Sequence, residues 1–501
     1  MGRYLYTIFF IVLTGFSVKE KQDSDIVSIT QSRGTVYSLL NHISDNTGIL
    51  FIYDSNIIDN NKRVRIRPGD YTLEKAVAII TENPQLSIIK EDKYVLIYYL
   101  PPEEKPAEIV KIPEKSEYSI VSGVIADRIT QEPVVYATVS LDGHSTGTVT
   151  NSEGEFRLRI HDTLLEHPIR FSHLGYQSRI IKSSLLLNQN ITFYLDQKIT
   201  PLQEVVVRVV DPIAAIRAMI ANKSRNYNKE PVYITAFYRE GIEHKNSMNL
   251  TEAVLKIYKP GINTNSSNEQ VKVLKMRRVS NPDNSDTLVA KVKSTINSTL
   301  LLDIVKNPPD FISPWQMDIY KYSHSDISTI DGRRVNVISF EQKEGISLPL
   351  YKGNLYLDAE NSALVSARFE VNPDYVHKAK ENLVLRLSRG LDITPEKAEY
   401  YVSYKQYQDY YYPNHIRGDL TFRVRRKNRL FSSKLNVWFE MANCLIETTE
   451  VNPFERDERL LTRTVFSETR YTYDSDFWEQ FNIILPEEKV KEYIKRYILN
   501  Q

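Results

Sequence analysis

The chain has 501 residues, which is too long for one ordinary core and suggests roughly two to four domains. It carries 64 Lys and Arg against 63 Asp and Glu, so its net charge of +1 gives no sign of a nucleic-acid partner or an acidic membrane partner. Tyrosine occurs 32 times against 17 glycines, and this aromatic content favours strands over long helices. We therefore expect a mainly β, multidomain protein.

The amino terminus predicts export. Residues 4–18 form an apolar run after Arg3, and the sequence then turns polar. The run is short for a membrane-spanning helix and is typical of a secretory signal, so we expect a signal peptide over residues 1–24. An uncleaved amino-terminal anchor is the alternative. The only cysteine is Cys444, so no internal disulfide can form and each domain depends on its own core.

A small α/β domain is expected over residues 25–99. The stretch TVYSLLNHISDNTG (35–48) has helical spacing and precedes the apolar strand ILFIY (49–53). A second helix, YTLEKAVAII (71–80), precedes a closing hairpin. On these elements the segment resembles the secretin and TonB short amino-terminal (STN-like) domain, which implies protein-protein docking in the periplasm. Residues 100–117 hold four prolines among charges and predict a semi-extended linker.

Short alternating runs separated by turn residues predict an antiparallel β-sandwich over residues 118–208. The runs SGVIADRITQEPVVYATVSLDG, TGTVTNSEGEFRLRI and IRFSHLGYQSR are similar to the carboxypeptidase regulatory-like domain, a transthyretin-like sandwich. The matching positions are Gly123, Pro133, Ala137, Val139, Gly147, Thr150, Gly154, Phe156, Phe171, Leu174, Gly175 and Tyr176. These are packing and turn positions, so the resemblance carries over no catalytic residue.

A larger antiparallel β-rich domain with a few helices is expected over residues 209–501. Asp211 and Pro212 predict a helix start, and Ile213, Ile216 and Ile220 an apolar stripe on that helix. Long alternating segments follow, and the charged amphipathic helix EEKVKEYIKRYIL ends the region. The phrases AFYRE, GNLYLD and DFWEQFNI resemble an uncharacterised carboxy-terminal part of Bacteroidetes envelope proteins. The repeated hairpins also resemble the half-barrels of lipoprotein carriers.

The stretch GHSTG satisfies the G-x-S-x-G pattern of a serine-hydrolase elbow, with Ser145 at the nucleophile position. That elbow requires a strand before the serine and a helix after it. Here TVTNSEGEFRLRI follows, which predicts a hairpin turned at Gly154. We therefore interpret the match as accidental and expect no catalytic residue.

Other candidate sites have simpler structural explanations. His161 and His167 lie near Asp162 and Glu166, but in an apparent loop without the spacing of a zinc site, so we expect no metal and no cofactor. The basic cluster RVRRKNR (423–429) fits a hairpin with a charged turn better than a docking patch. The tyrosines Tyr401, Tyr404, Tyr407 and 410–412 fit a packed sheet face better than a sugar-stacking ladder.

The sequence as a whole predicts a non-enzymatic exported protein of the cell envelope, in the periplasm or at the periplasmic face of the outer membrane. The two resemblances imply a docking or accessory role near a TonB-dependent transport or signalling system. An outer-membrane receptor or an inner-membrane regulator would then be the partner. One alternative is a carboxy-terminal half-barrel that binds a lipid or a glycan, and another is a hydrolase of envelope polymers.

Overall fold

The computed structural model describes residues 26–99, 117–187, 189–198, 210–245, 247–280, 290–292, 296–387, 390–427, 431–461 and 481–498. The expected signal peptide and nearly all of the expected linker lie outside these residues. The chain divides into two compact units, one within Met1–Phe51 and Ser55–Glu103 and the other formed by Ile52–Asp54 and Glu104–Gln501. The protein is mainly β, as the composition predicts.

The first unit contains the expected helices and hairpin. Helix α1 (Val36–Thr47) starts where the Thr35 side chain accepts a hydrogen bond from the Ser38 N–H, and it ends at Gly48 in the left-handed conformation. The other elements are β1 (Ile26–Ile29), β2 (Arg33–Thr35), β3 (Leu50–Tyr53), β4 (Arg63–Arg65), β5 (Gly69–Thr72), α2 (Leu73–Thr81), β6 (Leu86–Glu91) and β7 (Tyr94–Tyr99). Strand β1 pairs with β5, β2 with β4, and β6 with β7.

A two-sheet sandwich opens the second unit. One sheet has the order β11-β8-β14 and the other β10-β9-β12-β13. Their strands are β8 (Tyr118–Asp127), β9 (Thr138–Leu141), β10 (Gly147–Val149), β11 (Glu155–His161), β12 (Ile169–Ser172), β13 (Arg179–Ile181) and β14 (Asn190–Leu195), with the short helices η1 (Asp162–Leu164) and α3 (Ser183–Leu186). Phe171 contacts both Phe156 and Phe193 between the sheets, and all three are at most 1% exposed.

Two details of the sandwich differ from the expectation. Strand β14 pairs with β8 in parallel, because the chain first crosses to the other sheet through β12 and β13 and then returns. Strands β10 and β11 belong to different sheets, so the turn at Gly154 joins two sheets and does not close a hairpin. Gly154 has φ +73°, and its N–H donates to the Asn151 carbonyl at 3.1 Å. A side chain at Gly123 would meet the Ile191 carbonyl oxygen at 1.9 Å, which explains the glycine there.

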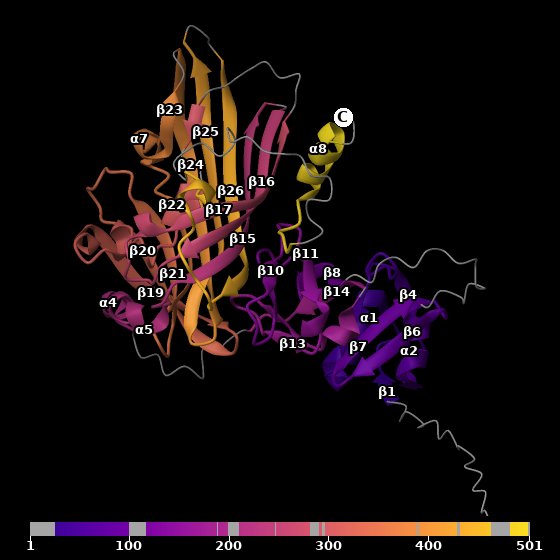
Figure 1. Cartoon of the computed structure of the whole chain (residues 1–501). Coiled ribbons are helices and arrows are strands. Elements are labelled where there is room, and N and C mark those ends of the chain that lie inside the picture. Colours follow the sequence, from indigo (N-terminus) through magenta and orange to yellow (C-terminus); the bar gives the residue numbers. More distant parts are fainter. Residues whose placement is uncertain are drawn as a thin grey trace, which may run out of the picture. The chain divides into compact units, whose positions relative to one another are not determined.

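A ten-stranded antiparallel sheet dominates the rest of the second unit (Figure 1). Its order is β17-β16-β15-β26-β25-β24-β22-β21-β20-β19. Strand β26, the last of the sheet in sequence, therefore pairs with β15, the first in sequence, and β17 and β19 are the edge strands. The strands are β15 (Val232–His244), β16 (Ser247–Lys259), β17 (Gln270–Ser280), β19 (Tyr320–Ile330), β20 (Arg333–Gln342), β21 (Tyr351–Asp358), β22 (Leu364–Val371), β24 (Leu391–Tyr407), β25 (Tyr410–Arg426) and β26 (Ser432–Glu447). The short strands β18 (Ala290–Val292) and β23 (Val384–Leu387) form a separate pair.

Helices accompany this sheet: α4 (Pro212–Ala221), α5 (Lys223–Asn226), η2 (Ser266–Asn268), α6 (Ile296–Leu301), η3 (Asp310–Ile312), η4 (Met317–Ile319), η5 (Val376–Lys378), α7 (Lys380–Leu383), η6 (Arg456–Glu458) and α8 (Glu488–Ile498). Helix α4 begins as predicted, with the Asp211 carboxylate accepting two backbone N–H bonds. The predicted stripe is partly wrong. Ile216 and Met219 are buried, but Ile213 is 38% exposed, because only one narrow face of this short helix meets the sheet.

One face of the large sheet, called the inner face below, is covered by the chain itself. Residues 296–319 pack there in a single core with the strands, and Phe311 stacks on Phe340 at 4.2 Å. Lys259 holds this segment through 2.7 Å contacts with Asp303 and Glu269, all three buried. Between this segment and strands β15, β16, β25 and β26 the remaining cavity is about 20 Å³, which is room for about one water molecule. A lipid bound at that place would therefore have to displace the segment. A separate hollow of about 620 Å³ lies beside α4.

Candidate functional site

The sandwich packs against the opposite, outer face of the large sheet, and Ser145 lies in this contact. Ser145 is 2% exposed, and its hydroxyl donates to the Ile446 carbonyl of β26 at 2.8 Å. The Lys405 ammonium in turn donates to the Ser145 carbonyl at 3.1 Å. A strand, β10, follows the serine where a nucleophile elbow has a helix. The GHSTG turn therefore belongs to a packed interface between two domains.

The other candidate residues from the sequence also take part in local structural contacts. His161 caps η1 through Nδ1, and His167 Nδ1 lies 3.3 Å from the Asp142 carbonyl oxygen. No group of three or more His, Cys, Asp or Glu side chains in the described part of the chain could hold a metal ion. Arg423 and Arg425 of the basic cluster pair with Glu396 and Asp392, while residues 428–430 lie outside the described residues.

The tyrosines separate into two groups. Tyr404, Tyr411 and Tyr412 are at most 3% exposed in the core, as the packed-face interpretation predicts. Tyr401 points the other way because side chains alternate along β24, and it lines a large groove on the outer face.

This outer groove has a volume of about 780 Å³ and crosses six neighbouring strands from β19 to β25. Two rows of side chains form its floor, and each row follows the register of the sheet. The first row is Ser323, Ser339, Asn354, Arg368, Tyr401 and Arg417, and the second is Lys321, Glu341, Lys352, Glu370, Glu399 and Asp419. Tyr136 of the sandwich forms a wall. The groove is thus a polar trough with an aromatic edge, and residues of both the sandwich and the large sheet form it.

Most charges of the groove are neutralised locally. Lys321 pairs with Glu341 at 3.6 Å and Lys352 with Glu370 at 3.4 Å. Arg417 makes two hydrogen bonds to Asp419, at 2.9 and 3.0 Å. At the wall, the rings of Tyr136 and Tyr401 stack with 5.5 Å between their centroids, and the Arg368 guanidinium lies 5.0 Å from the centre of the Tyr401 ring.

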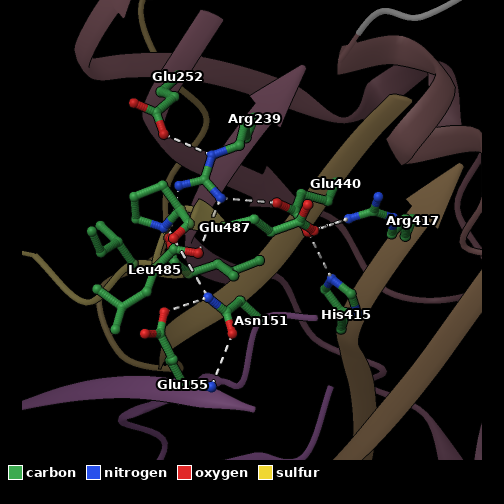
Figure 2. A network of polar contacts seen from close by, with 12 residues as sticks. Asn151, Glu155, Arg239, Glu252, His415, Arg417, Glu440, Leu485 and Glu487 are labelled. Atoms are coloured by element: carbon green, nitrogen blue, oxygen red, sulfur yellow. Dashed lines mark hydrogen bonds and ion pairs between the residues drawn. The ribbon is translucent and has the colours of Figure 1, made fainter. Parts of the chain in front are cut away.

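A buried ionic network anchors the Arg417 end of the groove (Figure 2). Arg417 reaches Glu440 at 3.4 Å, and Arg239 donates to Glu440 at 3.1 Å and to Glu252 at 2.6 Å. Arg239 also donates to the carbonyls of Ile484 and Leu485, at 2.8 and 3.4 Å. Residues 481–487, called the carboxy-terminal strap below, are thereby held against the sheet.

The strap also contacts the sandwich. Thr148 donates to the Ile483 carbonyl at 2.8 Å, and Asn482 bonds both the N–H and the carbonyl of Arg159. Ile483 and Ile484 share a small core with Val149 of the sandwich and Phe237 of the sheet. The network and the strap together fix the sandwich wall beside the groove floor.

The surroundings of Glu440 set its ionisation. Burial raises the pKa of the Glu440 carboxyl, but the effect of His415 at 3.6 Å and of the guanidinium groups of Arg417 and Arg239 is opposite and larger. The pKa of Glu440 is therefore lowered to about 2. Burial lowers the pKa of His415, so this imidazole is neutral at physiological pH. The network therefore holds ionised carboxylates against arginines.

A pH dependence follows from Glu440. Its pKa in the unfolded chain is about 4.3. Ionised Glu440 therefore stabilises the folded protein fully above that pH, and this stability is lost as the pH falls toward 2. We expect a loss of about 3 kcal/mol from this group across that range, measured by urea unfolding. The variant Glu440→Gln should start less stable and depend less on pH, whereas Glu341→Gln, at an exposed pair, should keep the wild-type slope. An unchanged slope in Glu440→Gln would contradict this assignment.

Comparison with known proteins adds one domain assignment. Residues 121–207 match the family model of the CarboxypepD_reg-like domain, in agreement with the resemblance of the sandwich. No curated protein matches the chain. No helix in the described ranges is long and apolar enough to cross a membrane.

Solved structures with some similarity share little sequence. A putative outer-membrane lipoprotein-sorting protein domain from Vibrio parahaemolyticus has 9% identity and a TM-score of 0.21, over 49% of this chain and 96% of that one. A DUF1329 family protein from Desulfovibrio piger has 12% identity and a TM-score of 0.20, over 47% and 94%. Lipovitellin has 9% identity and a TM-score of 0.22, over 48% and 27%. Similarity at this level does not establish a shared fold.

Proposed function

We propose that this chain is a non-enzymatic protein of the cell envelope that binds an extended glycan in the outer groove. The observation that carries the proposal is the 780 Å³ trough whose floor is two in-register rows of polar side chains and whose wall is Tyr136 of the sandwich. The hydroxyls and amide of Ser323, Ser339 and Asn354 offer donors and acceptors to a hydroxyl-rich ligand.

A glycan fits this floor better than a peptide does. Every strand from β20 to β25 in the floor is hydrogen-bonded to a neighbour on both sides, so a peptide crossing them finds no open strand edge. Its backbone N–H and C=O groups would depend on side chains alone. A sugar chain is normally recognised through side chains, and the spacing of strands, about 4.8 Å, is close to the length of one sugar ring.

The non-enzymatic part of the proposal rests on the surroundings of the candidate nucleophile. The Ser145 hydroxyl is buried and donates to a backbone carbonyl, so its proton is not shared with a general base. Hydrolysis of a soluble ester by the full chain that was lost in Ser145→Ala would overturn this part.

The place and partner remain those that the sequence implies. We infer an exported protein in the periplasm or on the periplasmic face of the outer membrane, docked through residues 25–99 to a TonB-dependent system. Support comes from the apolar amino terminus and from the STN-like resemblance. An intact Met1 on a cytoplasmic protein, found by mass spectrometry, would refute export. Failure of cross-linking in intact cells to join residues 25–99 to an envelope protein would refute the docking.

Glycan binding is tested through Asn354. Its side-chain oxygen accepts from Ser339 at 2.6 Å, whereas its amide nitrogen donates to no described residue and faces the groove. We expect the full chain to bind neutral oligosaccharides in calorimetry, and Asn354→Ala to weaken that binding by about fivefold, as the loss of one hydrogen bond would. Asn263→Ala removes an exposed amide outside the groove and should change nothing. If the wild-type chain binds no oligosaccharide, the proposed function is wrong.

A further inference from the structure

Arg368 differs from the other cations of the outer groove. Lys321, Lys352 and Arg417 each lie within 3.6 Å of a carboxylate, but Arg368 has no ion pair with any described carboxylate. Its side chain is exposed and lines the middle of the groove, in the same row as Asn354 on one side and Tyr401 on the other. This guanidinium is therefore available to a ligand.

Stacking holds Arg368 in position. The guanidinium lies over one face of Tyr401, and the ring of Tyr136 stacks with that tyrosine at an interplanar angle of 28°. A guanidinium stacked on an aromatic ring keeps its N–H edge free, and this edge matches the two oxygens of a carboxylate. His173 of the sandwich adds no second positive charge near neutral pH, because burial and Arg368 lower its pKa to about 4. The arrangement is a preformed site for an anionic group.

We propose that Arg368 binds the carboxylate of a uronic acid within the glycan held by the groove. This inference rests on the proposed function and specifies its ligand class. The neighbouring Asn354 and Ser339 would contact hydroxyls of the same or the adjacent sugar, since they follow Arg368 in one cross-strand row. The acidic second row would disfavour a polymer with a higher density of negative charge, because Glu370 and Glu399 lie directly opposite each other.

The test uses the full chain and three soluble probes in calorimetry: tetragalacturonate, the neutral tetramer of galactose with the same linkage, and tetraglutamate. We expect wild-type protein to bind tetragalacturonate at least about tenfold more tightly than the galactose tetramer, as a bidentate charged contact would. Arg368→Gln should remove this preference, so that the two sugar tetramers bind with similar affinity. Arg368→Lys should be intermediate, because lysine keeps the charge but not the planar fork.

Lys352→Gln is the matched control, because it removes a groove cation that is already paired with Glu370. It should retain most of the preference for the acidic tetramer. An Arg368→Gln variant that keeps the wild-type preference would overturn the inference while leaving glycan binding intact. If tetraglutamate binds as tightly as tetragalacturonate or more tightly, the ligand of Arg368 is an acidic peptide and the uronic-acid assignment is wrong. If neither sugar tetramer binds, the proposed function fails together with the inference.

Discussion

Replacing Arg239 with alanine should destabilise the second unit by about 3 to 5 kcal/mol, or prevent it from folding. Arg239 is 1% exposed and lies between the carboxylates of Glu252 and Glu440, which are 0% and 3% exposed. The alanine leaves these charges with one arginine fewer, and the carbonyls of Ile484 and Leu485 lose their donor. Both effects leave buried polar groups without a hydrogen-bond partner, which is destabilising because water cannot reach them.

This loss can be measured by guanidinium unfolding of the full chain, followed by tryptophan fluorescence. Lys321→Ala is the control: it breaks an ion pair whose two side chains are 72% and 59% exposed, and such a pair contributes little. Its unfolding curve should overlay that of the wild type. A loss below about 1 kcal/mol in Arg239→Ala would mean that the network does not hold the strap.

The second large effect is expected in the sandwich core. Phe156→Ala should cost about 3 to 5 kcal/mol, because the fully buried ring fills the space beside Phe171. Ser145→Ala removes only a hydroxyl that donates to the Ile446 carbonyl, and should cost about 1 to 3 kcal/mol. Hydrogen exchange in β8 and β11 of each variant reports the local stability. A larger loss for Ser145→Ala than for Phe156→Ala would show that the domain contact outweighs the sandwich core.

Local signals in the sequence predicted most of the individual elements. The cap at Asp211, the closing hairpin of β6 and β7 and the carboxy-terminal helix α8 are all where short-range patterns placed them. These features depend on residues close together in the chain. The register of β22 against β24 does not, and it sets which side chains share the groove floor.

The buried network was missed for a related reason. Sequence alternation marks a strand with one wet face, but β15 is buried on both faces over Val232–Gly241, apart from the half-buried Tyr233. Its run VYITAFYREG accordingly lacks alternation, and Arg239 and Glu240 within it are buried. A charged pair inside a non-alternating strand was the available signal. Glu252, one partner of Arg239, is 13 residues away, but its other partners, Glu440 and the strap, lie more than two hundred residues further on, beyond any local pattern.

The carboxy-terminal strap has a consequence for the order in which the molecule assembles. Thr148 and Ile483 are 335 residues apart in sequence, yet their hydrogen bond is part of the joint between the sandwich and the sheet. Each domain can collapse around its own core early, but the part of the joint that the strap makes must wait until residues 481–487 have been synthesised and have diffused back. Closing so long a loop has a high entropic cost and slows a folding reaction. Until then Val149 and Phe237 lack the cover that Ile483 and Ile484 give them in the finished protein, which leaves apolar surface open to other chains.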